Sequence, residues 1–589
     1  MKNLVDFYTE ENLRSEEELK KIKARLANLS ILRLLVFFLT SFGIYFLFGS
    51  LIIVSIITVV GITFFSFLLS RYLNTKEKKK LVQRKILINK TEIRVLEGDF
   101  SFLPTGKEFA DSYHYFSHDI DVFGSHSFFQ YINRTSTQQG TKELARTIIE
   151  NHIISIDKKQ EAIKELSKKV VWRQHFSALA SLVKTNHSST IILDFIQEYS
   201  VVFSKTTSML PVLFSIASFL LVGLFYFAII PFSVLIIWIF IGLGITAIFF
   251  KKTQEIYVNS DKAKATFKQY YLLLQEIENS HFLSKILQEK QQIIQSEKQK
   301  ASIIFMKFSK ILDAFDQRNN LLIAFIGNAF FLWDLRNAIN VEAWITEYKH
   351  TVKQWFEVIA FFDAENSLAN FCFNHPDYIY PKIVKENILI ESTQLGHPLL
   401  NPEKRIDHDF IILDKEFFII TGANMAGKST FLRTVSLSIV MSNIGLPVCA
   451  KSFKYTPVKL ITSMRTSDSL ADDESYFYSE LKRLKLIVEA IKSDDYFVLL
   501  DEILKGTNSK DKAIGSKKFV EKLVVSRSTG IIATHDISLC DLEADFSEIK
   551  NYYFDAEIIN EELYFDYLFK KGICKNMNAS FLLKKMKIV

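Results

Sequence analysis

The run from Phe417 to Val435 reads FFIITGANMAGKSTFLRTV and contains the pattern G-x-x-x-x-G-K-[ST]. An apolar strand is expected before the pattern and a helix after it, which is the context in which such a loop binds phosphate. Its glycines let backbone N–H groups turn towards phosphate oxygens, and the helix that starts there adds its positive dipole end. Lys428 is expected to reach the β and γ oxygens, and Ser429 is expected to ligate Mg²⁺. The predicted nucleotide-binding residues are Gly422, Ala423, Asn424, Met425, Ala426, Gly427, Lys428, Ser429 and Thr430.

Two further strand ends carry side chains suited to phosphate chemistry. The run YFVLLDEIL, Tyr496 to Leu504, is an apolar strand ending in Asp501 and Glu502. Asp501 would hold Mg²⁺ through water, and Glu502 is placed to polarise the attacking water. The alternative is two solvated carboxylates at a strand end. The run GIIATHD ends near His535, which either senses a γ-phosphate or is an ordinary loop histidine. The predicted catalytic residues are Glu502 and His535, and the predicted metal ligands are Ser429 and Asp501.

The elements that must position these motifs follow from the pattern of the whole chain. Strands are expected to alternate with helices after His375–Pro381, and the last domain boundary is placed there. Before it the sequence is mostly helical, since Asp157–Val183 and Asp261–Asp316 have an apolar period near 3.6 and no proline. The second of these runs is long enough for an extended arm.

Two long runs carry no charged residue, Leu34–Ser70 and Thr206–Phe250. Each is about twice the roughly 20 residues with which a helix spans a bilayer. Breaks are expected at Phe48–Ser50 and Ile229–Ser233, so each run is predicted to form a helical hairpin, giving four spans. The alternative is an unusually apolar soluble core, but soluble helices normally keep a polar stripe that these runs lack. Leu321–Trp333 is short for a span and is expected to be either a buried core helix or a membrane contact.

Lysine and arginine residues flank both uncharged runs, whereas the turns within the runs carry none. The positive-inside rule therefore puts the N-terminus, the middle segment and the C-terminal half in the cytoplasm. The predicted location is the cytoplasmic (inner) membrane, multi-pass, with the nucleotide-binding domain on the cytoplasmic side. The net charge of +7 fits an anionic partner, either nucleic acid or a lipid surface. The four cysteines show no paired spacing, which argues against a disulfide framework or a zinc site.

The predicted fold class is α plus α/β: two transmembrane helical hairpins, a mostly helical core or lever, and a C-terminal P-loop α/β domain. The predicted domains are an N-terminal helix (1–30), a transmembrane hairpin (31–70), a linker and helical core (71–205), a second transmembrane hairpin (206–250), a helical lever or core (251–375) and the P-loop domain (376–589).

The finer details of the motifs resemble the MutS family of mismatch-repair ATPases. TGANMAGKSTFLR resembles that family's phosphate-binding loop, in which Asn424 and Met425 are the distinguishing residues. DEILKGTNSKDKAIG, GHPLL, IGLPVCA and DVFGSHSFFQYINRTSTQQGTKELAR resemble further segments of the family. The resemblance covers roughly residues 110–205 and 253–589, with the second hairpin inserted between them.

This sequence also departs from the family pattern. Ala423 and Ala426 stand where the family loop has Pro and Gly, and neither change removes a side-chain contact to phosphate. Lys505 stands where the family has Arg. No Phe-x-Glu occurs before residue 400. The mismatch-reading domain that carries this motif in the family is therefore expected to be absent.

The resemblance implies ATP and Mg²⁺ as cofactors and a homodimer in which two subunits enclose ATP. The segment SDSLADDESYFYSEL, Ser467–Leu481, resembles the serine-rich loop and helix that complete the neighbour's nucleotide site. Ser475 is the predicted hydroxyl of this trans loop. Four acidic residues precede it closely, and they would repel phosphate unless they point away or pair within the loop.

The first functional hypothesis is a membrane-anchored MutS-like ATPase that hydrolyses ATP in a dimeric composite site and binds DNA through its helical core. Lysine-rich helices would contact DNA phosphates without reading bases, although a solvated helix face is the plain alternative. The second hypothesis is a membrane-bound ATPase that remodels a protein or lipid partner without acting on DNA. A transporter is a weak third hypothesis, because the spans carry almost no strongly polar residues.

Overall fold

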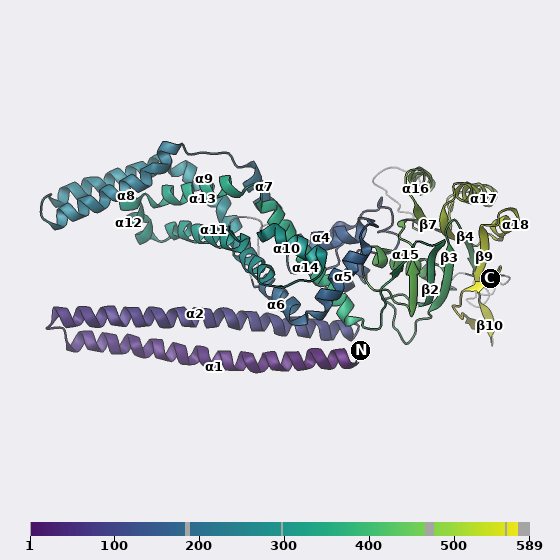
Figure 1. The fold of residues 1–589 in the computed structure, drawn as a ribbon, viewed down its shortest axis with the longest axis horizontal. Helices are drawn as coiled ribbons and strands as arrows, with labels where there is room; N and C mark the ends of the chain where they lie inside the picture. Colours follow the sequence, from purple (N-terminus) through teal and green to yellow (C-terminus); the bar gives the residue numbers. More distant parts are fainter. Residues whose placement is uncertain are drawn as a thin grey trace.

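The computed structural model describes residues 2–182, 189–295, 299–423, 425–465, 476–559 and 562–574. The molecule is elongated, with a helical part that ends at Asn374 and an α/β domain at one end (Figure 1). Two long helical arms leave the helical part in the same direction, away from the α/β domain.

The first arm is a hairpin of α1 (Lys2–Phe46) and α2 (Leu51–Leu96). The chain turns between the two helices at residues 47–50, which include the expected break. Both helices continue far beyond the uncharged run, so the domain boundaries predicted at residues 30 and 70 fall inside helices. The change of polarity there does not end a helix, because Lys, Glu, Arg and Leu are all good helix formers.

The second arm consists of α8 (Lys205–Tyr226) and the first part of α9 (Phe232–Glu278). Pro231 begins α9, so the turn falls within the expected break. The helix α9 also runs past residue 250, the predicted end of the hairpin, and carries the chain into the core. A shorter helix, α12 (Leu321–Phe331), packs against both helices of this arm.

The helix α12 is exposed in its first half and buried in its second. Leu321 and Leu322, at its start, are 87% and 73% exposed, whereas Gly327, Asn328 and Ala329 are buried against neighbouring helices. The next helix, α13 (Trp333–Tyr348), leaves at an angle of 82° to α12. The expectation of a buried core helix therefore describes the second half of α12 and not the first.

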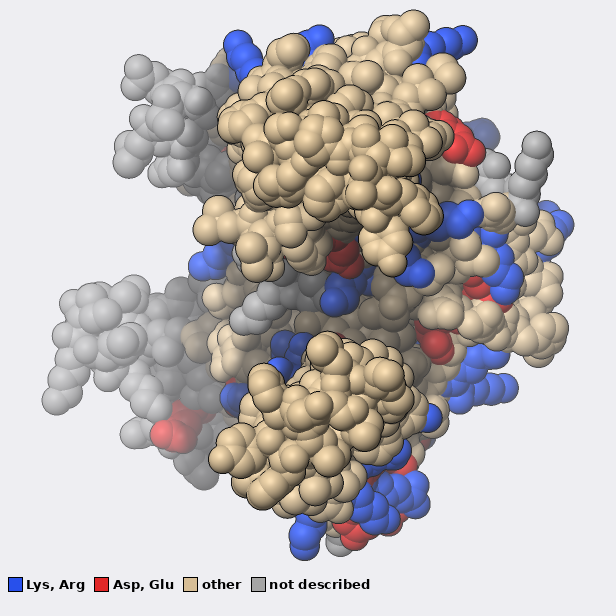
Figure 2. Space-filling view, turned by 90° about the vertical axis from the view of Figure 1, so that its left-hand side faces the viewer, with Lys and Arg blue, Asp and Glu red and all other residues tan. Residues whose placement is uncertain are grey.

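The free halves of both arms expose apolar side chains. The most apolar 18-residue windows of α1, α2, α8 and α9 have mean hydropathies of 1.9, 2.7, 2.2 and 2.5, and 0%, 6%, 22% and 11% of their residues are buried. Figure 2, which faces the free ends of the arms, shows two separate clusters of uncharged side chains with charged side chains behind them. Among the residues that the structure describes, four helices are long and apolar enough to cross a membrane, or five if α12 and α13 form one bent span.

The remaining helices pack into a core at the base of the arms. The run Asp261–Asp316 is not one extended arm, because the chain leaves the helix after Glu278 and folds back as two further helices. Phe267 on α9 and Phe305 on α11 are fully buried in one cluster with Phe356 of α14, and this burial favours the folded arrangement. The helices are α3 (Phe128–Ile132), α4 (Gln138–Ile149), α5 (Ile156–Lys168), α6 (Val170–Ala180), α7 (Ser189–Glu198), α10 (Lys285–Gln295), α11 (Ala301–Asp316) and α14 (Val352–Asn374), with 3₁₀ turns at Lys107–Phe109 and Gln317–Asn319.

The α/β domain begins after α14, at the expected boundary. Its main sheet has the strand order β12-β9-β4-β8-β7-β6, and β4, β6, β7, β8 and β9 run parallel. A second sheet has the order β1-β5-β2-β3, and β10 pairs with β11. The strands are β1 (Lys382–Ile383), β2 (Ile388–Leu395), β3 (His408–Leu413), β4 (Phe417–Gly422), β5 (Ser452–Tyr455), β6 (Lys459–Ser463), β7 (Tyr496–Asp501), β8 (Thr529–Ala533), β9 (Ile549–Phe554), β10 (Glu557–Ile559), β11 (Glu562–Tyr564) and β12 (Lys570–Lys571).

The alternation of side chains along β4 explains how helices cover both faces of the main sheet. Phe418 and Ile420 join the cluster that contains the inner face of α15, whereas Phe417 and Ile419 join the cluster with α16 and α17. All six residues of β4 are buried, as expected for a central parallel strand. The helices of this domain are α15 (Lys428–Asn443), α16 (Tyr476–Ala490), α17 (Ser509–Val525) and α18 (Leu542–Asp545), with a 3₁₀ turn at Ile537–Asp541.

Candidate nucleotide site

Three neighbouring strands of the main sheet bring the predicted motifs to one edge. β4 pairs with β8, and β8 pairs with β7, with Ile420 and Asp501 both level with Ala533. Because these strands are parallel, their carboxyl ends lie side by side. The loop after β4, Glu502 after β7 and His535 after β8 therefore meet, although 113 residues separate Gly422 from His535.

The loop after β4 has the backbone conformation of a phosphate-binding turn. Gly422 and Gly427 have φ of 153° and 105°, and Met425 has φ of 68°. A Cβ atom on Gly422 would lie 2.6 Å from the carbonyl oxygen of Phe554, so the close approach of the two strands requires glycine there. The helix α15 starts directly at Lys428 and points its N-terminus at the loop.

The side chains of Lys428 and Ser429 are already engaged at this edge. Lys428 Nζ donates hydrogen bonds to the carbonyl oxygens of Gly422 (2.7 Å) and Ala423 (3.0 Å). Burial lowers the pKa of Lys428, which is 6% exposed. Ser429 Oγ donates a hydrogen bond of 2.6 Å to Asp501 Oδ2. The hydroxyl and carboxylate oxygens predicted to hold Mg²⁺ therefore lie together, and both are ligand types that Mg²⁺ prefers.

Glu502 and His535 form a close pair. His535 Nε2 lies 2.7 Å from Glu502 Oε1, and it lies 3.4 Å from Lys428 Nζ. The hydrogen bond with His535 is the main cause that lowers the pKa of Glu502 to about 2. Lys505, the residue that replaces the family's Arg, lies 3.8 Å from the other oxygen of Glu502. Glu502 has φ of 49°, a strained value for glutamate that its neighbours must maintain.

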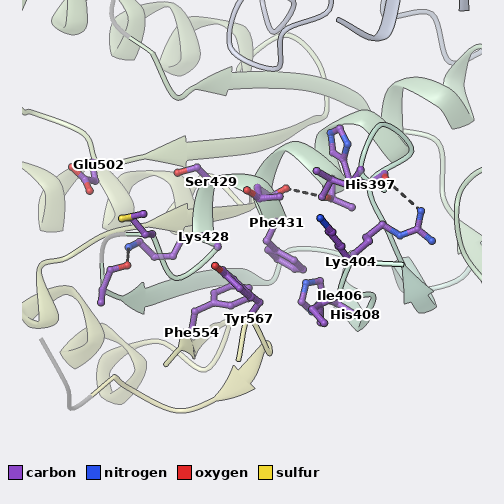
Figure 3. A pocket seen from close by; sticks show the side chains of 17 residues that line it. His397, Lys404, Ile406, His408, Lys428, Ser429, Phe431, Glu502, Phe554 and Tyr567 are labelled. Atoms are coloured by element: carbon purple, nitrogen blue, oxygen red, sulfur yellow. Dashed lines mark hydrogen bonds between the residues drawn. The ribbon is translucent and has the colours of Figure 1, made fainter. Parts of the chain in front are cut away.

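A pocket of about 510 Å³ opens beside the loop. In Figure 3, Lys428, Ser429 and Glu502 lie towards one end of this pocket, and Lys404 and His408 lie towards the other. Of the predicted nucleotide-binding residues, the lining includes Ala423, Met425, Gly427, Lys428, Ser429 and Thr430. Gly422 and Ala426 belong to the same turn, whereas Asn424 lies outside the residues that the structure describes.

The far end of the pocket contains residues that the sequence did not single out as site residues. His408 packs its ring against Phe431 at 5.4 Å, and Tyr567 closes over Gly427 from a distant part of the chain. Burial lowers the pKa of both His397 and His408 to about 4, so both rings are neutral at physiological pH. The one indication in the sequence that these residues belong to the site was the GHPLL run, which contains His397. No spacing rule connected this run with the phosphate-binding loop.

The helix α16 holds the segment that follows Glu502. Glu480 is 2% exposed, and its carboxylate faces the backbone N–H groups of Leu504, Lys505 and Gly506, which partly offset the rise of its pKa caused by burial. A Cβ atom on Gly506 would lie 2.9 Å from Phe477 Cβ, so the two segments are in direct contact. Part of the segment predicted to be the serine-rich loop is thus the first turn of α16. Ser475, the predicted trans hydroxyl, lies outside the described residues.

The family comparison agrees with the features of this edge. Residues 418–585 match the family model described as MutS domain V. The α/β domain is therefore similar to MutS domain V over these residues. Similar proteins include a DNA mismatch repair protein MutS of Thermotoga neapolitana, 33% identical over 221 residues, which are 36% of this chain and 26% of that protein. The MutS protein homolog 4 of Homo sapiens is 28% identical over 245 residues, which are 40% of this chain and 26% of that protein.

The family model covers residues 418–585, which lie in the α/β domain, and no part of either arm. A DNA mismatch repair protein MutS of Bacteroides thetaiotaomicron is 28% identical over 232 residues, or 38% of this chain. The chain spans about a quarter of the length of each of these relatives. The helical arms are therefore features of this chain that must be interpreted from its own residues.

Proposed function

We propose that this chain is an ATP hydrolase that is anchored in a membrane by its two arms. The observation that carries the catalytic part is the convergence of Lys428, the Ser429–Asp501 pair and the Glu502–His535 pair at one pocket. These groups supply a phosphate-binding cation, metal ligands and a carboxylate next to the same loop. Phosphoryl transfer to water needs little more than such positioning and charge stabilisation.

Each side chain has a defined task in this proposal. Lys428 leaves its two carbonyl partners and binds the β and γ phosphate oxygens, which is favourable because the ammonium is poorly hydrated in its buried position. Ser429 and Asp501 hold Mg²⁺, which neutralises phosphate charge when bound. Glu502, kept ionised by its hydrogen bond with His535, accepts a hydrogen bond from the attacking water and orients it. The base of ATP packs at the other end of the pocket, near Phe431 and His408.

The nucleotide part of the proposal is tested by removing the cation. We expect Lys428→Ala to lose tight ATP binding, because a charge-assisted phosphate contact is lost. Lys451→Ala, a change at an exposed lysine of the same domain, is the matched control. Binding of a fluorescent ATP analogue measures both variants. Equal affinity of Lys428→Ala and the wild type would exclude Lys428 as the phosphate ligand.

The membrane part of the proposal is supported by the exposed apolar halves of the arms. Burying them in lipid removes large areas of apolar surface from water. Both sets of free ends lie on the same side of the molecule, so one bilayer can receive both arms (Figures 1 and 2). The basic residues that flank the apolar runs favour the cytoplasmic (inner) membrane, with the MutS domain V in the cytoplasm.

We further propose that the chain acts as a homodimer on DNA. The support is the similarity to proteins named for DNA mismatch repair and the net charge of +7. The free ends of the arms are apolar and offer no phosphate ligands, and the run Asp261–Asp316 is folded into the core. DNA contact is thus assigned to the basic surfaces at the base of the arms rather than to a lysine-rich clamp.

Duplex binding at two salt concentrations tests the DNA proposal. Several neutralised phosphates give an affinity that falls steeply as salt is raised. No preference for a mismatched duplex over a perfect one is expected. If the protein binds neither the mismatched nor the perfect duplex at low salt, with or without ATP, the second hypothesis is favoured, an ATPase that remodels a protein or lipid partner.

A further inference from the structure

A second cavity lies where the first arm meets the helical core. It has a volume of about 270 Å³ and shares no lining residue with the nucleotide pocket. Its walls come from α2, from the segments on either side of α3, and from α6 and α14. Six polar residues define it for the following argument: Arg84, Arg134, Arg173, Gln174, Asn366 and Asn370.

The cavity carries an excess of positive charge. Three arginines line it, and Glu92 is the one carboxylate in its lining. Glu92 is already paired, since Arg134 Nε donates to its Oε1 at 2.6 Å. Arg173 donates hydrogen bonds to Asn370 Oδ1 and to the carbonyl oxygen of Leu166. Arg84 makes no hydrogen bond or ion pair with the described part of the chain, so its guanidinium is available to a ligand.

Asn366 is the second observation that indicates a ligand. Its side chain is 4% exposed and lines the cavity. Neither its Nδ2 nor its Oδ1 has a hydrogen-bond partner among the described residues. Buried amides are normally paired, because an unpaired one costs the full free energy of removing it from water. A polar ligand in the cavity would pair this amide.

The position of the cavity favours a soluble ligand over a lipid. The uncharged run of the first arm is followed by Arg71, and Arg84 lies 13 residues further along the same helix. At 1.5 Å per residue this is about 20 Å from the apolar run, beyond the reach of a lipid headgroup at its end. The volume is at the lower limit of small-molecule pockets, which suits a molecule of the size of a sugar phosphate.

We propose that this cavity, the arm-base pocket, binds a small phosphorylated metabolite, a phosphate monoester of a sugar or polyol. Arg84 binds the phosphate, because the planar guanidinium matches phosphate oxygens with two parallel hydrogen bonds. Asn366 pairs with a hydroxyl of the same ligand. Bound in this way, the ligand connects α2 with α6 and α14 and fixes the first arm against the core that carries the MutS domain V.

The test uses the full chain purified in detergent, with ADP and Mg²⁺ present to fill the nucleotide pocket. Ribose 5-phosphate is the probe, and ribose is its uncharged control. We expect saturable calorimetric binding of ribose 5-phosphate and no binding of ribose. Arg84→Gln should weaken binding about tenfold or more, as expected for one charge-assisted hydrogen bond. Lys78→Gln, an exposed position on the same helix outside the pocket, should leave binding unchanged.

A second variant separates a ligand contact from a structural role. Asn366→Leu keeps the size of the side chain and removes an amide that has no partner in the protein. The ligand-free variant should therefore unfold at the same temperature as the wild type or higher, while its affinity for ribose 5-phosphate falls. A lower unfolding temperature without ligand would show that Asn366 serves the fold and would remove it from the site.

Three results would overturn the proposal. The first is no saturable binding of either ribose 5-phosphate or inorganic phosphate to the wild type. The second is equal binding by Arg84→Gln and the wild type. The third is an Arg84-dependent preference for another source of phosphate, either short-chain phosphatidic acid or a single-stranded oligonucleotide, which would assign the pocket to a lipid or a nucleic acid.

Discussion

At the scale of residues, the side chains proposed to bind and hydrolyse ATP already contact one another at the edge of the sheet. Glu502 is held in a left-handed backbone conformation, and its carboxylate is oriented by His535 at 2.7 Å. Lys428 and Ser429 are likewise fixed by hydrogen bonds to the loop and to Asp501. Groups that are positioned in advance need not reorganise as charge develops, which is how electrostatic catalysis gains most of its effect.

The Glu502–His535 pair leads to a prediction about pH dependence. In the wild type the hydrogen bond with His535 is the main cause that lowers the pKa of Glu502 from 4.5 to about 2, so this carboxylate stays ionised down to a pH near 2. In His535→Gln the pKa of Glu502 should rise towards 4.5. As the pH is lowered, the rate of ATP hydrolysis by this variant should therefore begin to fall at a higher pH than the rate of the wild type. Near neutral pH the rate should fall about tenfold or more, as expected for one charge-assisted hydrogen bond. The measurement is the turnover number as a function of pH.

His350→Gln, at an exposed histidine of the helical core, is the control for this prediction. It should keep the wild-type rate and pH profile. If His535→Gln also keeps both, His535 does not orient Glu502 during catalysis.

At the scale of elements, α16 connects the serine-rich segment with the residues that follow Glu502. The carboxylate of Glu480, near the start of α16, faces the N–H groups of residues 504–506, and Phe477 contacts Gly506. A displacement of α16 would therefore move the backbone next to Glu502. The segment that is predicted to reach the neighbouring subunit therefore contacts the backbone next to Glu502.

Removing the Glu480 carboxylate should separate ATP binding from hydrolysis. In Glu480→Ala the backbone N–H groups of residues 504–506 lose the negative charge that they face, which should lower the unfolding free energy by about 2 kcal/mol. ATP affinity should be unchanged, because Glu480 does not line the pocket, while the turnover number should fall. Glu489→Ala, an exposed change on the same helix, should affect neither quantity. A loss of ATP affinity equal to the loss of turnover would contradict this division.

The elements differ in how far the sequence predicted them. The loop, the strand before it and the helix after it follow a local pattern, so Gly422 to Thr430 could be placed without a structure. The arms were predicted from uncharged runs, but their lengths were not, because α2 and α9 continue as polar helices. His408 and Tyr567 reach the pocket through tertiary packing, and no spacing in the sequence connects them with the loop.

At the scale of the whole molecule, one continuous core joins two arms, which are apolar enough to cross a membrane, to the α/β domain that resembles MutS domain V. Asp119 of the core accepts hydrogen bonds from Thr462 Oγ1 and from the backbone N–H groups of Met464 and Arg465. Asp121 pairs with Arg433 on α15, 3.0 Å away, and with Arg465. The helix that begins at the phosphate-binding loop is thus connected by one ion pair, Arg433–Asp121, to the core from which the arms extend.

A homodimer with composite sites predicts that two inactive variants restore each other. Ser475→Arg should block the trans loop, and Lys428→Ala should block the phosphate-binding loop. A mixed dimer then contains one intact site, because one subunit supplies Lys428 and the other supplies Ser475. Confinement to one membrane raises the concentration of both subunits and favours the mixed dimer.

The mixture should regain part of the wild-type ATP hydrolysis. The matched control mixes Lys428→Ala subunits with subunits that carry both Lys428→Ala and Ser475→Arg. This mixture should stay inactive, because neither subunit supplies Lys428. If mixed dimers of the two single variants are demonstrated and the mixture remains inactive, Ser475 does not complete the neighbour's site.

The central claim is a membrane-anchored ATP hydrolase whose activity depends on Glu502. Its most direct test is ATP hydrolysis by carbonate-washed membranes that carry either the wild type or Glu502→Gln, compared at equal protein. We predict that both proteins stay with the washed membranes and bind ATP. We also predict that Glu502→Gln hydrolyses ATP at least about 100-fold more slowly than the wild type, as expected when a general base is removed. Release of the protein by carbonate, or equal hydrolysis by the two membranes, would contradict the account.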